Sequence, residues 1–493
     1  MNRENFAAML RDKFLIATLF LACVLLFAQL HDVCLWGDEA LTALLAKNVL
    51  SYGYPRVWDG RNLLCVFDPS RETNAHFAWV AQPWLAEYLT AVSFSLFRPS
   101  TFTARLPFVL IGLLTVPMLY ALALELFGSR HAARWAAFLL ATSVAFLLHA
   151  RQCRYYAIVV FATVWALWSY WRALRGHRWA AAHLAGALIA LFHSNFLNFF
   201  GAAAGMAAHY VLFGPSITQY RRSLLVAILV TLLATLPWFA YAGLPSQDKI
   251  AWGRYFLNVG FYLAKLNQFA FPFVLAIPLG LALRKEPRAA LFHEQARSSV
   301  WLVILASGAT VLVCALFRVH HLRYIIGLVP LGCALAGVGL AWAWRTQSVF
   351  AVALAAVLVT SNLLSAPATP LFRRGFLPRS YLWDYVAQLT HRYEDDLEVV
   401  VRFLRRNATK DQAIYIEDTA FQVIFYTGMK VIDSRFRENR PKVADADWVF
   451  SRAPFSLVPQ HLVRLEETGL AQAYDRFEVP IPDTPRGASM PDP

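Results

Sequence analysis

The stretch KFLIATLFLACVLLFAQLHDVCLWGDEALTALLAKNVL, residues Lys13–Leu50, joins an apolar run to a pair of adjacent carboxylates. The run over residues 14–30 approaches the ~20 residues that an α-helix needs to cross the hydrocarbon core of a bilayer. Basic residues precede it as in a signal peptide, but the run is long and lacks a small-residue cleavage site, which favours a retained first membrane helix. Asp38 and Glu39 then lie at the mouth of that helix. The rest of the sequence must explain why a hydrophobic chain places two acids there.

Apolar blocks recur along the chain. Of its 493 residues, 58% are hydrophobic and 15% are charged, whereas a soluble domain carries about 25% charged residues. We therefore expect an all-α polytopic membrane protein with about 11 transmembrane helices. The block over residues 84–97 is shorter and carries Glu87, so we interpret it as an amphipathic helix at the membrane interface. The candidate spans lie near residues 14–30, 104–126, 134–149, 155–171, 179–193, 196–213, 223–242, 260–283, 299–317, 324–344 and 348–365.

The basic residues indicate the orientation of the chain. The formal net charge is +14 at pH 7, but Arg and Lys form short clusters between apolar blocks and no stripe with exposed aromatic residues, which argues against nucleic-acid binding. Alternate loops are rich in Arg, and the positive-inside rule places these loops in the cytoplasm. The N-terminus is then cytoplasmic, whereas the long first loop, residues 31–103, and the C-terminus face outward.

The composition changes after residue 365. Over residues 366–480, charged segments with helical and strand periodicity alternate, which predicts a small extracytoplasmic α/β domain. The Pro-rich residues 481–493 are expected to form a disordered tail. The sequence therefore predicts a transmembrane domain over residues 1–365, followed by this α/β domain and the tail.

Asp38 and Glu39 allow more than one interpretation. An acidic pair in a loop is usually just solvated, and Asp38 could also cap the amphipathic segment EALTALLAKNVLSYG at its N-terminus. Capping needs one acid, not two, and Ser or Thr would serve equally well. A carboxylate held at a membrane boundary could instead accept a proton from an incoming hydroxyl, which is the work of a general base.

A first basic cluster lies in HARQCRYYAIVV, residues 149–160, between the third and fourth candidate spans. Arg151 and Arg154 are three residues apart, so on a continuing helix they would share one face. They are either interfacial side chains that snorkel beside aromatic anchors or ligands of a lipid phosphate, whose oxygens Arg binds bidentately.

A second basic cluster, with His320 and Arg323, lies in FRVHHLRYIIGLVP, residues 317–330. Adjacent histidines point in different directions on a helix and make a poor metal pair. His193, at the outer end of the fifth candidate span, is either a satisfied polar residue or part of a site. Because ionisable groups at membrane depth are costly and tend to be functional, we expect one polar cavity at the outer leaflet. Such a cavity suits an anionic lipid donor and a hydroxyl acceptor.

In these motifs the chain resembles the polytopic GT-C glycosyltransferases, which include the protein O-mannosyltransferases, the lipid A aminoarabinose transferases and many bacterial relatives. Their Asp-Glu loop looks like WGDEALTALLAKNV, and their next pattern is similar to QPWLAEYLTAVSFSLF with ARLPFVLIGLLTVPMLYALALELFG. Later turns of the family resemble ARQCRYYAI, FHSN and RYIIGLVP. The similarity spans residues 1–345, with the motifs in the family's order.

The resemblance implies an inverting enzyme that moves a sugar from a polyprenyl-phosphate donor, undecaprenyl in a bacterium, to an acceptor outside the cytoplasm. The acceptor would be the hydroxyl of a lipid, a glycan or a protein, and the enzyme would lie in the inner membrane. Asp38 would be the general base, supported by Glu39. The resemblance also implies substrate-binding residues at the phosphate and around the cavity: Arg151, Arg154, Tyr155, Arg323, Tyr324, Gln82, His193 and His320.

The chain departs from the family pattern at two places. Gln82 stands where relatives often have a basic residue before a Pro pair, and Gln152 stands where some have a second acid. No cofactor is therefore assigned, although a divalent metal stays open.

Two other functions stay open as well. One is a lipid-linked glycan polymerase or ligase, whose key residues usually lie in a large late loop. The other is a transporter, which tends to have internal repeats around a midplane site.

Overall fold

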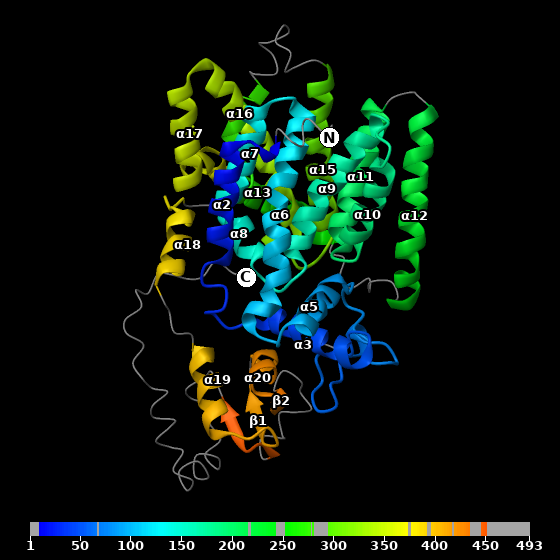
Figure 1. Cartoon of the computed structure of the whole chain (residues 1–493), viewed down its shortest axis with the longest axis vertical. Coiled ribbons are helices and arrows are strands. Elements are labelled where there is room, and N and C mark those ends of the chain that lie inside the picture. The colour runs from blue at the N-terminus through cyan, green and yellow to red at the C-terminus, as the bar shows by residue number, and fades with distance from the viewer. Residues whose placement is uncertain are drawn as a thin grey trace.

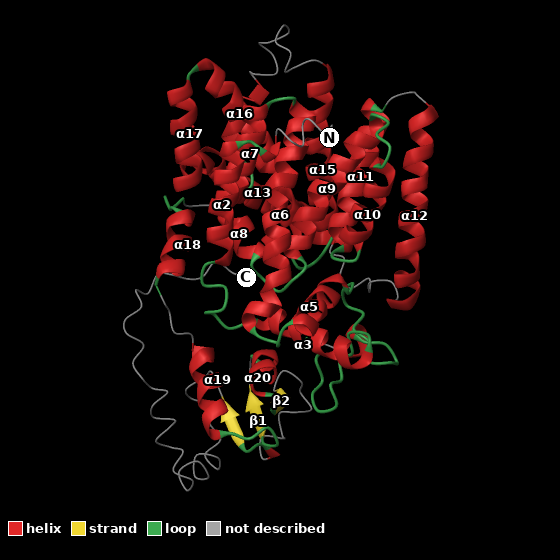
Figure 2. Ribbon diagram, viewed as in Figure 1, coloured by secondary structure: helices red, strands yellow, loops and turns green. Residues whose placement is uncertain are grey.

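The chain folds into a bundle of helices with a smaller unit at one end (Figure 1). The computed structural model describes residues 9–66, 69–214, 218–242, 252–277, 279–280, 294–372, 376–391, 396–416, 419–433 and 445–450. Most of the described residues are helical, and their strands lie in the smaller unit (Figure 2). The tail predicted over residues 481–493 lies outside the described residues.

Among the described residues, 6 helices are long and apolar enough to cross a membrane, and the number is 8 if each of 2 bent helix pairs forms one span. The chain is therefore a multi-pass membrane protein. The single helices are α6 (Thr101–Phe127), α9 (Tyr156–Leu174), α11 (Phe196–Phe213), α12 (Thr218–Ala242), α15 (Glu294–Ala315), and α16 (Val329–Thr346) with the preceding turns of η4 (Leu322–Leu328). The bent pairs are α7 (Arg130–Thr142) with α8 (Val144–Ala150), and α17 (Ser348–Thr360) with η5 (Leu363–Leu371).

The predicted number of 11 spans is not confirmed. Two of the predicted blocks form α2 (Lys13–Phe27), with 15 residues, and α10 (Ala180–Phe192), with 13, fewer than the ~20 that cross a bilayer without distortion. A third block is broken near Pro272, between α13 (Tyr255–Phe269) and η3 (Phe273–Leu275), where proline removes a backbone donor and favours a break in the helix. Apolar composition alone does not reveal such interruptions.

Small residues let the bundle helices approach closely. A Cβ atom added to Gly205 of α11 would lie 2.3 Å from the Cα of Ala306 in α15. One added to Gly337 of α16 would lie 2.7 Å from the carbonyl oxygen of Ala132 in α7. Packing of this kind holds membrane helices together, because lipid tails are as apolar as the side chains and no hydrophobic effect drives their association.

The first long loop folds against one end of the bundle, where Figure 1 shows α3 and α5. Its helices are α3 (Gly37–Tyr52), α4 (Pro69–Glu72) and α5 (Leu85–Leu96). Gly53 ends α3 with a φ of 81°, a left-handed conformation that glycine adopts without strain. The short helix predicted over residues 84–97 is present as α5.

The strands of the smaller unit form a parallel sheet. β1 (Ala413–Ile416) lies between β2 (Lys430–Asp433) and β3 (Trp448–Phe450). The helices α19 (Asp396–Asn407) and α20 (Ala420–Thr427) share a hydrophobic core with β1. The sequence predicts alternating helices and strands in this region, whereas the domain boundaries at residues 366 and 480 stay predictions.

The segment before the sheet packs beside the bundle. In α18 (Tyr381–Thr390), the hydroxyl of Tyr385 donates a hydrogen bond to the carbonyl oxygen of Leu25 in α2, at 2.7 Å. Figure 1 shows α18 in line with α17, away from the strands. The sheet unit is therefore joined to the last helices of the bundle through a helix that itself contacts the bundle.

The sheet unit also contacts the first loop directly. Asn62 donates a hydrogen bond to the carbonyl oxygen of Met429 at 3.2 Å and accepts one from the N–H of Val431 at 2.8 Å. The hydroxyl of Tyr426 in α20 accepts a hydrogen bond from the N–H of Leu35 at 2.8 Å. These contacts hold the segment that leads to Asp38.

Candidate active site

Asp38 is the second residue of α3. The helix begins at Gly37 with Trp36 as its N-cap residue, so Asp38 is not the cap that the sequence suggested. The carboxylate of Glu39 accepts the hydrogen bond from the backbone N–H of Trp36 instead, at 3.3 Å. Asp38 thus lies in the first helical turn, where the N-terminal end of the helix dipole favours negative charge, and its side chain faces other parts of the chain.

Two arginines from distant segments meet the Asp38 carboxylate. Oδ2 lies 3.2 Å from Nη1 of Arg323, in η4, and 3.5 Å from Nη2 of Arg154, in the turn before α9. The Asp38 side chain is 25% exposed, whereas that of Arg154 is only 6% exposed. A carboxylate that solvent or substrate can reach is therefore backed by buried positive charge.

Other side chains fix Arg154 in place. Its guanidinium donates hydrogen bonds to the hydroxyl of Thr42 at 2.9 Å and to the side-chain oxygen of Gln82 at 3.1 Å. The ring of Tyr155 lies 5.5 Å from the guanidinium carbon. Two residues predicted to bind substrate, Gln82 and Tyr155, thus contact the arginine that pairs with Asp38.

Arg323 lies between two aromatic rings. Its guanidinium carbon is 5.8 Å from the ring centres of Trp36 and Tyr324, within the range of a cation–π contact. The carbonyl oxygen of Tyr324 accepts a hydrogen bond from Asn198 of α11 at 2.9 Å. This bond ties η4 to the bundle and keeps Arg323 at the end where Asp38 lies.

Glu39 has a different environment. Its side chain is fully buried and forms two hydrogen bonds with Arg105 of α6, at 2.9 and 2.7 Å. It also accepts a hydrogen bond from the N–H of Cys153 at 2.7 Å. Glu39 thereby connects α3, α6 and the turn before α9. Its geometry is that of a bidentate buried ion pair, and any support that it gives to Asp38 acts through the position of α3.

Arg151 lies apart from Arg154. The sequence suggested that both share one face of a continuing helix, which is wrong, because α8 ends at Ala150 and α9 begins only at Tyr156. Arg151 donates hydrogen bonds to the hydroxyl of Tyr385 at 2.8 Å and to the carbonyl oxygen of Ala28. It thus joins α2 to α18, while Arg154 faces Asp38.

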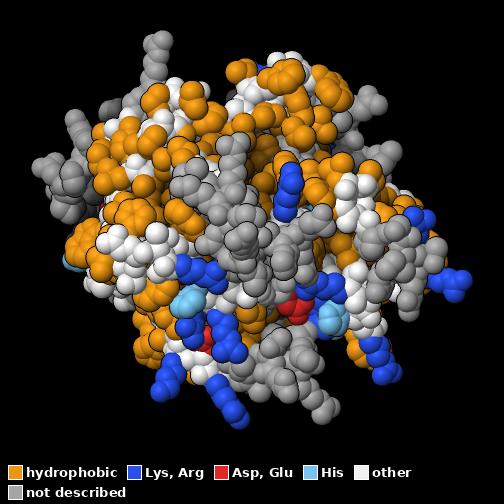
Figure 3. Space-filling view, turned by 90° about the horizontal axis from the view of Figure 1, so that it is seen from above, with side chains coloured by type: hydrophobic (Ala, Val, Ile, Leu, Met, Phe, Trp, Pro, Cys, Tyr) orange, Lys and Arg blue, Asp and Glu red, His pale blue; other side chains and the backbone are white. Residues whose placement is uncertain are grey.

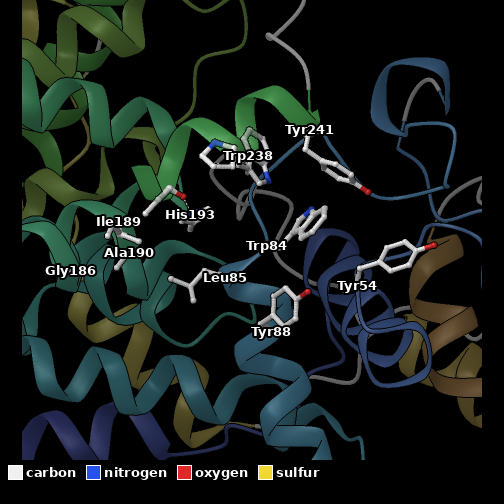
Figure 4. A pocket seen from close by; sticks show the side chains of 12 residues that line it. Tyr54, Trp84, Leu85, Tyr88, Gly186, Ile189, Ala190, His193, Trp238 and Tyr241 are labelled. Atoms are coloured by element: carbon white, nitrogen blue, oxygen red, sulfur yellow. Dashed lines mark hydrogen bonds between the residues drawn. The ribbon is translucent and has the colours of Figure 1, made fainter. Parts of the chain in front are cut away.

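His193 lines a separate cavity. This cavity of about 740 Å³ lies between α5 and the ends of α10 and α12, and Figure 4 shows aromatic rings from both sides facing it. Its wall is mostly apolar, and the rings of Trp84 and Tyr241 meet edge to face with centroids 5.6 Å apart. Nε2 of His193 lies 3.2 Å from the carbonyl oxygen of Ala234, and burial lowers the pKa of this histidine.

His320 packs against an aromatic ring. Its ring centre lies 4.6 Å from that of Phe261 in α13. Its Nδ1 atom is buried without a hydrogen-bond partner among the residues that the structure describes. Neither His320 nor His193 is among the described side chains that pair with Asp38.

The opposite end of the bundle is rich in basic residues. Figure 3 shows that end, where Lys and Arg side chains lie among hydrophobic ones. Arg130 begins α7, and Arg172 and Arg175 lie where α9 ends, whereas the other end of α9 follows Arg154, which pairs with Asp38. Basic residues therefore gather at the end of the bundle that the sequence predicts to face the cytoplasm.

Within the described residues, no group of three or more His, Cys, Asp or Glu side chains is placed to hold a metal ion. The divalent metal that the sequence left open thus has no assigned protein ligands in this part of the chain. Asp38 and Glu39 both have arginine partners, Asp38 with Arg323 and Glu39 with Arg105.

Several contacts of the site were not predicted from the sequence. In the sequence, Arg105 stands out only as part of the ARLP motif, although a basic residue at the start of a long apolar helix is itself a signal of a buried partner. Thr42 gave no signal, because a hydroxyl on an amphipathic helix is common. Glu87 stands out in the sequence only as an acid within a short apolar block.

Comparisons with known proteins agree with this architecture. The family model for dolichyl-phosphate-mannose-protein mannosyltransferases matches residues 81–241. No curated protein matches the chain. The structure is similar to that of ArnT from Cupriavidus metallidurans in the apo state, with a TM-score of 0.61 at 16% identity over 92% of this chain and 94% of that chain.

Two further solved structures have a related fold. ArnT from Cupriavidus metallidurans bound to undecaprenyl phosphate matches with a TM-score of 0.57 at 17% identity, over 85% of both chains. The apo oligosaccharyltransferase of Archaeoglobus fulgidus matches with a TM-score of 0.50 at 12% identity, over 86% of this chain and 65% of that chain. The chain therefore has the fold of these solved structures, and the mannosyltransferase family model matches one segment of it, residues 81–241.

Proposed function

We propose that the chain is an inverting glycosyltransferase that takes a sugar from a polyprenyl-phosphate donor and transfers it to an acceptor hydroxyl. The observation that carries this proposal is the meeting of Asp38 with Arg154 and Arg323. One carboxylate and two guanidinium groups are what such a transfer needs. The carboxylate accepts a proton, and the cations stabilise the phosphate that leaves.

In the proposed reaction, the acceptor hydroxyl attacks the anomeric carbon of the sugar from the face opposite the phosphate. Its proton passes to the carboxylate of Asp38 as the new C–O bond forms. The bond between the anomeric carbon and the phosphate oxygen breaks, and the electron pair leaves with the polyprenyl phosphate. Arg154 and Arg323 bind the phosphate oxygens, which Arg matches bidentately.

The solved relative with undecaprenyl phosphate supports a lipid-phosphate donor by analogy of fold. The basic end of the bundle supports an orientation with the N-terminus in the cytoplasm. On this proposal the reaction takes place at the periplasmic face of a bacterial inner membrane, with undecaprenyl phosphate as the carrier. The acceptor would be a lipid, a glycan or a protein.

The test uses purified full-length protein in lipid nanodiscs. Undecaprenyl-phosphate-linked hexoses and pentoses are supplied with a membrane extract as the acceptor source, and the release of undecaprenyl phosphate is measured. Asp38→Asn should lower the rate by about 10²- to 10⁴-fold, the usual contribution of a general base, with unchanged folding. Asp32→Asn, an acid of the same loop that pairs with His31, serves as the matched control. An Asp38→Asn protein with full activity would reject Asp38 as the base.

A further inference from the structure

Glu87 is a buried acid near the site that the proposed transfer step does not use. It lies on α5 and is 2% exposed. Its Oε2 atom has no hydrogen-bond partner among the residues that the structure describes. A buried polar atom without a partner costs free energy, so the placement of this carboxyl calls for an explanation in terms of its neighbours.

Arg154 is the cation that acts on Glu87. The charge of Arg154 favours the ionised form of the Glu87 carboxyl. Arg154 uses its Nη1 and Nη2 atoms for Thr42, Gln82 and Asp38, whereas its Nε atom has no partner among the described residues. The buried guanidinium of Arg154 thus pairs with Asp38, and its charge also acts on the carboxyl group of Glu87.

The other groups near Glu87 have fixed charge states around neutral pH. The thiol of Cys153 lies 3.4 Å from the hydroxyl of Thr90, one turn along α5, and burial raises the pKa of that thiol far above neutral. Glu39 and Arg105, the next charged groups from α3 and α6, form a buried ion pair with each other. Burial raises the pKa of Glu87 to about 7, although the charge of Arg154 and the backbone N–H of Glu87 oppose this shift.

We propose that Glu87 is a positioning residue of the transferase site, which competes with the phosphate of the lipid donor for Arg154 and so sets how tightly that phosphate is held. The inference rests on the proposed function, because it takes a lipid phosphate as the ligand of Arg154. It adds a specific role for an acid on α5, a helix that also lines the aromatic cavity with Leu85 and Tyr88.

The sign of the effect follows from the charge of Glu87. Below about pH 7 the carboxyl is neutral, and the charge of Arg154 is opposed only by Asp38 and is available to a phosphate. Above that pH the carboxyl is ionised and attracts the guanidinium. Phosphate binding should therefore weaken as the pH rises through about 7, and the loss should be absent when position 87 cannot ionise.

The experiment measures the binding of undecaprenyl ethyl phosphate to purified full-length protein in nanodiscs from pH 5.5 to 8.5. This probe is a phosphodiester, so its own charge does not change over that range. For the wild type we expect an affinity loss on the order of tenfold across the range, the size expected for one partly screened charge near the ligand. Glu87→Gln should bind the probe with nearly constant affinity, and should match the wild type at pH 5.5.

The matched control is Glu125→Gln, which removes a partly buried acid beside Arg172 at the opposite end of the bundle. That variant should keep the wild-type pH profile. If the affinities of Glu87→Gln and of the wild type change with pH in the same way, the role of Glu87 is overturned. The proposed function is left intact by that result. A wild type that binds no probe at any pH would overturn the lipid-phosphate donor and this inference together. If Glu87→Gln does not fold, the test is the affinity of the wild type for the probe as the pH rises. An affinity that does not change with pH contradicts the proposal.

Discussion

Two neighbouring residues, Asp38 and Glu39, end in environments that differ in almost every respect. The side chain of Glu39 is fully buried, and both of its oxygens are bonded to Arg105 at 2.9 Å or less. The side chain of Asp38 is 25% exposed, and its ion pairs, with Arg154 and Arg323, are longer, at 3.5 and 3.2 Å. On a helix, adjacent residues point about 100° apart, so one acid faces the interior of the bundle while the next faces the open side.

The difference shows which ion pair is structural and which can react. A buried bidentate pair has no room for a third partner, and breaking it leaves an uncompensated charge. When two arginines share one partly exposed carboxylate, one of the arginines can instead bind a substrate phosphate, while the carboxylate keeps the other arginine. The changes below test this contrast, from the largest expected effect to the smallest.

Arg105→Met should be the most damaging change. It leaves the carboxylate of Glu39 buried without its cation, so the free energy of unfolding should fall by about 3–5 kcal/mol. Thermal unfolding in detergent measures the loss. The double variant Glu39→Leu with Arg105→Met should recover most of it, because no buried charge then remains. A double variant as unstable as the single one would show that the pair is not the source of the effect.

Arg323→Gln should have the opposite effects, a small change in stability and a large loss of transfer activity. Because this ion pair is partly exposed, its loss should change stability by only about 0–1 kcal/mol. The rate of sugar transfer should fall by about 100-fold, as expected when one group that stabilises transition-state charge is removed. The two measurements are made on one preparation, by thermal unfolding and by release of undecaprenyl phosphate. A large loss of stability would place Arg323 with Arg105 as a structural residue.

Arg151→Met tests the difference between Arg151 and Arg154, the two arginines of the turn between α8 and α9. Arg151 bonds to Tyr385 and to the carbonyl oxygen of Ala28, so its removal should lower the free energy of unfolding by about 1–2 kcal/mol. Transfer should stay within about threefold of the wild type, since the contacts of Arg151 lie between α2 and α18. A loss of transfer as large as that of Arg323→Gln would give Arg151 the phosphate-binding role that the family resemblance implies.

Tyr426→Phe should have the smallest effect. It removes the hydroxyl that accepts a hydrogen bond from Leu35 and meets the hydroxyl of Thr101 at 2.7 Å, for an expected cost of about 1 kcal/mol. Proteolysis of the sheet unit in the folded protein should become faster. Tyr54→Phe, whose hydroxyl bonds to an exposed carbonyl oxygen, should leave that rate unchanged, and equal rates for both variants would argue against the docking contact.

Much of the outer architecture could be predicted from local sequence. The helix over α20 and its end at Gly428, the strands over β1 and β2, and the short helix α5 all follow from periodicity and from turn residues. The number of spans could not be predicted in this way. Hydropathy measures how apolar a block is, but whether a helix continues through it depends on proline, on bends and on the neighbours that satisfy its backbone.

Some features of the candidate site also follow from local sequence, whereas others do not. The sequence alone determined that acids lie on the first loop, that basic clusters lie at particular helix ends, and that the chain is built of membrane helices, because composition and spacing are local properties. Only the tertiary structure decided that Asp38 meets Arg154 and Arg323 while Glu39 meets Arg105. The partners lie 66 to 285 positions apart along the chain, and which of them meet is decided by how the helix ends pack in space.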